Sequence, residues 1–307
     1  MPDIRVTDDP AKADIIAVSH TKDLEASGAE LRRRLSPDQK LILLSEEPFW
    51  DTVWGQNSQA RQLVVQTGAG ALPMVQLNHQ TSSIYNFARI PYFLLTQHHF
   101  RTRYAVWFAR NARFGAQDWR QHFARVANRV AFVMARRTSA RYEVAFSLCN
   151  QRTAIAGACQ GAVHFGQGWQ EQPRRQELPD WHLDKLMTLD QKFQFVCAIE
   201  NTHLPNYVTE KMFDAYAVGA IPLYMAGADH RVHELMPQKA WVNLLNVPPT
   251  AVPGQLAEFL PDTEFLDAYV DVQHALAALF RNADPLIAEL DRLRDALIHE
   301  FTVVLNE

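Results

Sequence analysis

Short apolar runs alternate with amphipathic stretches along most of this chain. In its first part, runs typical of buried strands occupy residues 13–19, 40–44, 62–66 and 74–77. Between the first two runs, residues 23–35 carry apolar side chains at helical spacing. A strand, a helix and a second strand in this order are typical of a βαβ unit, so we predict a parallel sheet here.

The same alternation resumes near residue 130. The predicted strands of this second part are residues 130–134, 163–168, 193–199, 221–225 and 240–245. The predicted helices are residues 140–148, 152–160, 183–191 and 207–218. The run at 193–199 is apolar throughout, as expected for a strand that is covered on both faces. The pattern therefore predicts a second α/β domain.

Two residues indicate where the helix at 207–218 begins and ends, and a third indicates the start of the next strand. Asn206 is predicted to be its N-cap, and Gly219 is predicted to end it. Pro222 has no backbone N–H, so we expect it among the first residues of the following strand.

The chain after residue 255 is predicted to be mostly helical. Its last helix opens at Asp284, with an apolar face made of Leu286, Leu290, Leu293, Leu297, Phe301 and Val304. Because the polar face carries acidic as well as basic residues, we expect this helix to dock on protein and not on a membrane surface.

The domain junction is predicted within residues 90–129, a stretch rich in aromatic residues and arginine. The predicted organisation is an N-terminal α/β domain at 1–125, a second α/β domain at 126–250, and C-terminal helices at 251–307 that pack back on the domains.

The composition is that of a globular protein, with 48% hydrophobic and 21% charged residues among 307. The net charge of −4 does not favour a nucleic-acid partner. No run of about 18 apolar residues occurs, so no membrane span is expected, and peripheral association with a membrane stays open. The polar N-terminus does not resemble a signal peptide. Cys149, Cys159 and Cys197 are predicted to be reduced core residues, which favours a cytoplasmic location.

Polar residues crowd the loop between two predicted strands and the first turn of the helix there: Glu200, Asn201, Thr209, Glu210 and Lys211. Ligands of α/β folds bind at the carboxyl ends of strands and at helix N-termini. Lys211 could reach a phosphate of a nucleotide diphosphate, Glu210 could accept hydrogen bonds from ribose hydroxyls, and Asn201 could donate or accept. The alternative is an ordinary charged first helical turn.

The string from Glu200 to Lys211, E-N-x-x-x-x-x-Y-V-T-E-K, resembles the donor-binding signature of the α1,3/α1,4-fucosyltransferases, glycosyltransferase family 10. The resemblance is strong over residues 130–245, is weaker over 13–95, and points to a bacterial-type member. It implies two Rossmann-like domains in the GT-B arrangement, with GDP-fucose bound by the C-terminal one. It also implies that Lys211 contacts the GDP diphosphate, with Asn201 nearby. Glu210 and Tyr207 would lie at the ribose and guanine side.

A catalytic base is expected on the other domain. Glycosyl transfer with inversion needs a group that takes the proton of the acceptor hydroxyl. Glu46-Glu47-Pro48 follows a predicted strand and matches an E-x-P element of the family, with Glu46 in the position of the catalytic glutamate. Glu47 is the second choice, and two adjacent carboxylates could raise one pKa. The alternative is a solvated acidic loop.

A diphosphate leaving group usually meets more than one cation. The resemblance offers Arg174 and Arg175 after the glycine turn at 163–168, and Arg152 at the start of a helix. The alternatives are a surface pair for the first two and a structural role for the third. The histidine spacings match no metal motif, so no metal ligands and no cofactor are expected.

These observations predict an inverting, metal-independent fucosyltransferase of glycan biosynthesis or protein glycosylation. GDP-fucose would be the donor substrate, and a hydroxyl of an oligosaccharide or glycolipid the acceptor. The alternatives are a transferase for another GDP-sugar and a catalytically inactive nucleotide- or glycan-binding module.

Overall fold

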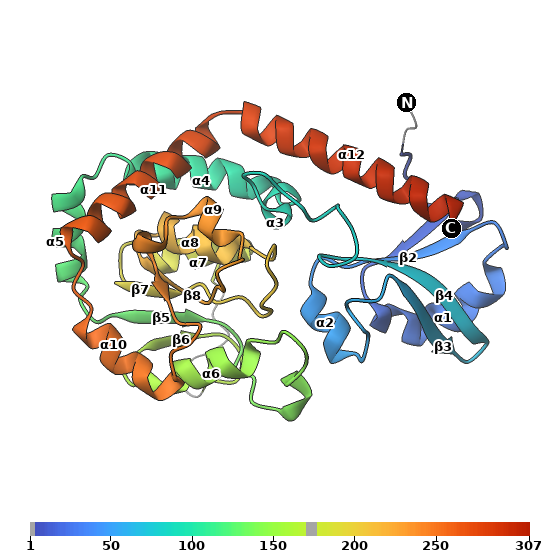
Figure 1. The fold of residues 1–307 in the computed structure, drawn as a ribbon, viewed down its shortest axis with the longest axis horizontal. Helices are drawn as coiled ribbons and strands as arrows, with labels where there is room; N and C mark the ends of the chain where they lie inside the picture. The colour runs from blue at the N-terminus through green and yellow to red at the C-terminus, as the bar shows by residue number, and fades with distance from the viewer. Residues whose placement is uncertain (1–3, 170–176) are drawn as a thin grey trace. The chain divides into compact units, whose positions relative to one another are not determined.

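The computed structural model describes residues 4–169 and 177–307 and divides the chain into two compact units. Unit 1 comprises Met1–Tyr92 and Ile287–Glu307, and unit 2 comprises Phe93–Leu286. Each unit is built on its own sheet (Figure 1), so the prediction of an α/β chain with two sheets is confirmed.

The sheet of unit 1 has four strands in the order β1-β2-β4-β3. Their bounds are Ile15–Val18 for β1, Lys40–Leu44 for β2, Gly70–Leu77 for β4 and Gln62–Thr67 for β3. The first three run parallel, as predicted, whereas β3 is antiparallel to β4. The connection between β3 and β4 is two residues long, which permits only a hairpin. The helices of this sheet are α1 (Leu24–Arg34) and α2 (Pro48–Val53).

The sheet of unit 2 has five strands, all parallel, in the order β6-β5-β7-β8-β9. Their bounds are Val163–Phe165, Val130–Val133, Phe195–Cys197, Ile221–Tyr224 and Val242–Asn243. Figure 1 shows α7 and α8 on one side of this sheet and α6 on the other. The helices of this unit are α4 (His98–Asn111), α5 (Ala116–Arg125), α6 (Cys149–Ala158), α7 (Trp181–Leu189), α8 (Glu210–Ala217), α9 (Val232–Leu235), α10 (Val252–Glu258) and α11 (Thr263–Arg281), and the short α3 (Tyr92–Leu95) crosses the boundary.

The boundary between the units falls at residue 92, within the stretch 90–129 where the junction was predicted and before the predicted domain limit at residue 125. The aromatic side chains of α4 and α5 explain the difference, because they pack on α11 within unit 2. Phe108 lies 5.6 Å from Phe280, and Trp119 lies 5.0 Å from Tyr269, measured between ring centroids.

Two local predictions are wrong. The helix predicted at 140–148 is only a 3-10 turn at Ala140–Tyr142. The helix predicted from residue 207 begins at Glu210, and its N-cap is Thr209 in place of Asn206. Gly219, with φ of 74°, follows that helix as predicted, and Pro222 is the second residue of β8.

The last helix, α12 (Asp284–Asn306), buries Leu293 and Val304 of the predicted apolar face, together with two glutamates that were not expected to be buried. Leu290 is 43% exposed, whereas Glu289 and Glu300 are buried. One oxygen of Glu289 accepts the backbone N–H groups of residues 88, 89 and 90. Glu300 accepts from Ser83 and Arg61. Residues 287–307 thereby belong to unit 1.

Candidate functional site

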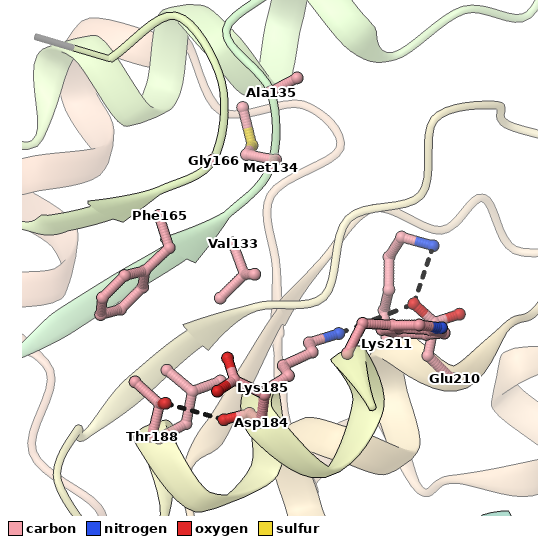
Figure 2. Close-up of a pocket in the computed structure, with 12 residues that line it drawn as sticks. Val133, Met134, Ala135, Phe165, Gly166, Asp184, Lys185, Thr188, Glu210 and Lys211 are labelled. Atoms are coloured by element: carbon pink, nitrogen blue, oxygen red, sulfur yellow. Dashed lines mark hydrogen bonds and ion pairs between the residues drawn. The ribbon is translucent and has the colours of Figure 1, made fainter. Parts of the chain in front are cut away.

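A pocket of about 290 Å³ opens where β5 and β6 end and α8 begins (Figure 2). We call it the lysine pocket, after Lys185 and Lys211, which line it from α7 and α8. Its other lining residues come from the ends of β5 and β6 and from the same two helices: Val133, Met134, Ala135, Phe165, Gly166, Trp181, Asp184, Thr188, Leu189 and Glu210. This is the edge at which parallel α/β sheets bind ligands.

Glu200, which follows β7, joins the start of α8 to this edge. Its carboxylate accepts hydrogen bonds from the backbone N–H and the hydroxyl of Thr209, both at 2.8 Å. The ammonium of Lys211 lies 2.9 Å from Glu200 Oε2 and donates to Thr209 Oγ1 at 2.8 Å. Because Glu200 is only 2% exposed, these contacts keep its charge compensated inside the protein.

Glu210 lies between the two lysines. Its Oε1 is 3.5 Å from the Lys211 ammonium and 3.6 Å from the Lys185 ammonium. Oε2 is buried and has no hydrogen-bond partner within the described parts of the chain. Burial favours the neutral form of Glu210, but the charges of Lys211 and Lys185 outweigh it and lower its pKa. Burial raises the pKa of Glu200, and the nearby charge of Glu210 adds to this effect against the pull of Lys211.

A network of buried polar side chains, which was not predicted from the sequence, holds the Lys185 ammonium beside Glu210. Asp214 Oδ2 lies 2.7 Å from the Lys185 ammonium. Asp214 Oδ1 accepts from the Tyr104 hydroxyl at 2.7 Å and lies 2.7 Å from His182 Nε2. The only sequence signal was the spacing of Glu210 and Asp214, which puts two carboxylates on one face of a helix.

The tautomer of His182 follows from its neighbours. Arg103 Nη1 lies 3.1 Å from Nδ1 of His182, and a guanidinium can only donate. Nδ1 therefore accepts, and Nε2 carries the proton that is donated to Asp214. This arrangement fixes the ring and orients the carboxylate that holds Lys185.

The structure brings together only part of the predicted donor site. Asn201, Tyr207 and Arg152 are buried and do not line the lysine pocket. Arg152 lies beneath the end of β7, where its Nη1 donates to the carbonyl of Ile199 at 3.2 Å. Arg174 and Arg175 lie outside the described residues.

Glu46 and Glu47 follow β2 in unit 1, at the carboxyl edge of its sheet, as predicted. Burial raises the pKa of Glu46, and the adjacent Glu47 raises it further, while His20 opposes both. A carboxylate with a raised pKa is better suited to accept a proton than an ordinary one.

The part of the chain that the structure describes contains no group of three His, Cys, Asp or Glu side chains placed to hold a metal ion. None of its helices is long and apolar enough to cross a bilayer. Cys149, Cys159 and Cys197 are buried free thiols, as predicted.

The parallel sheet defines unit 2 as an α/β domain, and the pocket and ion cluster lie at the strand ends, where such domains bind ligands. Residues 159–269 match the family model described as glycosyltransferase family 10 (fucosyltransferase) C-term. The matched stretch lies within unit 2, and over this stretch the family assignment from the sequence is confirmed.

Among solved structures, the chain is similar to a crystal structure of an alpha1,3-fucosyltransferase, with 21% identity over 48% of this chain and 38% of that one, at a TM-score of 0.33. A structure with GDP gives 17% identity over 55% and 47%, at a TM-score of 0.35. One with GDP-fucose gives 17% over 59% and 48%, at 0.29. The chain therefore spans less than half the length of these proteins. No curated protein matches it.

Proposed function

We propose that this chain is an inverting, metal-independent fucosyltransferase that uses GDP-fucose and a glycan acceptor, an oligosaccharide or a glycolipid. The observation that carries the proposal is that the stretch matching glycosyltransferase family 10 contains the buried cluster from Glu200 to Lys211 beside a pocket. The α1,3/α1,4 linkage and a cytoplasmic location are further parts of the proposal.

The lysine pocket has the chemistry that a nucleoside diphosphate requires. Lys211 and Lys185 supply two ammonium groups on one side of the pocket, which can neutralise a diphosphate. Glu210 Oε2 is an acceptor without a hydrogen-bond partner among the described residues, so it suits a ribose hydroxyl. Lys185 is a second cation beside Lys211, and Arg174 and Arg175, which lie outside the described residues, stay candidates for this role.

The proposed reaction is a single displacement. The acceptor hydroxyl oxygen attacks the anomeric carbon of fucose, the bond from that carbon to the phosphate oxygen breaks, and GDP leaves with the electron pair. Glu46 takes the hydroxyl proton, and its raised pKa supports this role over that of an ordinary surface carboxylate. The two lysines stabilise the charge that develops on the leaving diphosphate.

Calorimetric titration with GDP tests the donor site. Lys211→Met should weaken GDP binding at least about tenfold, because it removes a charge-assisted hydrogen bond. Lys239→Met is the matched control, since Lys239 is a 62% exposed lysine of unit 2 that pairs with Glu264. Urea midpoints of both variants show whether each is folded. Unchanged GDP affinity in folded Lys211→Met would refute the donor site.

Transfer assays test the base and the reaction separately. Glu46→Gln should abolish fucose transfer and leave GDP affinity unchanged. If Glu47→Gln has this effect and Glu46→Gln does not, Glu47 is the base. Binding of GDP without transfer from any GDP-sugar would identify a binding module, and binding of UDP alone would contradict the fucosyltransferase proposal.

A further inference from the structure

A second pocket, of about 360 Å³, lies between α6 and the segment that follows β5. We call it the arginine pocket. Its lining residues are Arg136, Arg137, Thr138, Asn150, Thr153, Ala154, Gly157 and Trp169. It shares no lining residue with the lysine pocket. Two neighbouring residues line different pockets: Ala135 lines the lysine pocket, and Arg136 lines the arginine pocket.

Arginines gather on the segment that follows β5, two of them lining this pocket, and Glu143 contacts the pocket lining by accepting from Asn150 Nδ2 at 3.0 Å. Three arginines, Arg136, Arg137 and Arg141, occur within six residues of a chain whose net charge is −4. Within the residues described here, neither Arg136 nor Arg141 has a carboxylate within 4.0 Å.

Aromatic rings hold these arginines in place. The Arg136 guanidinium lies 5.8 Å from the ring centroid of Trp169, and Arg137 and Arg141 both lie over Tyr142, at 5.4 and 4.9 Å. The Trp169 indole is itself fixed, because its N–H donates to the carbonyl of Met134 at 2.9 Å. A guanidinium stacked on its face still presents its N–H edge, which fits a phosphate or carboxylate with two parallel hydrogen bonds.

The rest of the pocket is shaped for a small polar body. On α6, Ala154 presents only a methyl group and Gly157 presents no side chain, and a Cβ on Gly157 would meet no atom within 4 Å. Asn150 Oδ1 is buried without a hydrogen-bond partner in the described structure, so it can accept from a ligand hydroxyl.

We propose that the arginine pocket binds a compact hydroxylated ligand that carries an oxyanion, either a sugar phosphate or a sugar acid, independently of the lysine pocket. The guanidinium of Arg136 takes the oxyanion, and Asn150 accepts from a hydroxyl. The two ligand sources share this chemistry and differ only in whether phosphate or carboxylate meets the arginine.

Calorimetric titration with glucose 6-phosphate, glucuronate and glucose tests the proposal on the full chain. One or both of the anionic sugars should bind, and neutral glucose should bind at least about tenfold more weakly, since it lacks the charge-assisted bonds. Stronger binding of glucose 6-phosphate or of glucuronate tells which oxyanion the pocket prefers. Failure of both anions to bind better than glucose would overturn the proposal.

Two variants locate the binding. Arg136→Gln removes the charge, and Gly157→Leu adds bulk to the pocket lining at a helical position where a Cβ would meet no atom within 4 Å. Each should lower the affinity for the bound anion at least about tenfold. Arg113→Gln, at another exposed arginine of unit 2, is the control and should change nothing. Lys211→Met should also leave this binding intact. Loss of anion binding in Lys211→Met, or its retention in both pocket variants, would overturn the proposal, whatever GDP does.

Discussion

Replacing Asp214 with asparagine should destabilise unit 2 strongly, because it uncouples the buried ion pair behind the lysine pocket. Asp214 is fully buried and lies 2.7 Å from the Lys185 ammonium. Asparagine keeps the volume and one acceptor oxygen for Tyr104 and His182, but removes the charge that compensates Lys185. Breaking one side of a buried pair costs about 3–5 kcal/mol. With a urea dependence of about 2 kcal/mol per molar, the unfolding midpoint should fall by about 1.5–2.5 M.

The loss should also depend on pH in a defined direction. Burial would raise the pKa of Asp214, but Lys185 and His182 outweigh it and hold the pKa far below its ordinary value. A carboxyl whose pKa is lower in the folded than in the unfolded protein stabilises the fold fully at pH values above its unfolded pKa, about 3.9. This stabilisation is lost as the pH falls below that value. The difference between wild type and Asp214→Asn should therefore be largest near neutral pH and shrink below about pH 4.

Urea titrations followed by circular dichroism at several pH values measure both effects. Asp190→Asn is the control, since Asp190 pairs with Arg110 at 2.6 Å but both side chains are about 30% exposed. Such partly exposed pairs contribute about 0–1 kcal/mol. A midpoint for Asp214→Asn no lower than that of the control, or a difference that stays constant down to pH 3, would refute the reasoning.

Three further predictions concern single positions. Gly166→Ala should lower the free energy of unfolding in urea by about 1–3 kcal/mol. The φ of Gly166 is 126°, and the new Cβ would lie 2.5 Å from the carbonyl oxygen of Met134. The control Gly157→Ala, at a helical position with open space around the Cβ, should be neutral or stabilising. Glu300→Gln should speed hydrogen exchange of the Ser83 amide, which donates to Glu300. Burial would raise the pKa of Glu300, but hydrogen bonds from Ser83 and Arg61 and the charge of Arg61 outweigh it and lower the pKa. The difference in exchange between wild type and variant should therefore vanish as pH falls below about 4. GDP binding at pH 8 should take up protons, because the entering anion favours protonation of Glu200, whose pKa is raised. The uptake appears as a binding heat that depends on the buffer, and Glu200→Gln should abolish it. Equal heats in all buffers for the wild type would contradict this prediction.

Much of the fold could be predicted because its signals are local. The apolar run at 40–44 coincides with β2, and Gly219 and Pro222 occupy the positions that their backbone chemistry requires. The helix predicted at 140–148 failed for a non-local reason. Phe146 has φ of 62°, and its carbonyl accepts from the N–H of His203 at 2.7 Å. Contacts with a loop more than fifty residues away replace the helical hydrogen bonds, and periodicity cannot reveal them.

The buried face of α12 shows the same limit in a helix that was predicted correctly. Glu289 and Glu300 are buried because backbone N–H groups some 200 residues away satisfy their carboxylates. Apolar spacing correctly placed Leu293 and Val304 on the buried face, but it assigned both glutamates to the polar face and counted Leu290, which is 43% exposed, as buried. Sequence periodicity gives the presence of a helix, whereas the partners that permit a buried charge come only with the tertiary structure.

Part of the candidate site could be predicted from the sequence and part could not, and the charges of both parts decide how a diphosphate could bind. Glu200 to Lys211 lie within twelve residues, so the sequence revealed them, whereas Lys185 and Asp214 meet only in the fold. The cluster holds as many carboxylates as cations: Glu200, Glu210 and Asp214 against Lys185, Lys211 and Arg152. An anion that enters a balanced cluster must release a lysine from its carboxylate or have a carboxylate protonated. Of the two carboxylates beside Lys211, Glu200 is the one whose pKa is raised. If the diphosphate binds at Lys211 as proposed, Glu200 therefore holds the Lys211 ammonium in place before binding, and it is also the carboxylate that takes up a proton and releases the ammonium to the diphosphate.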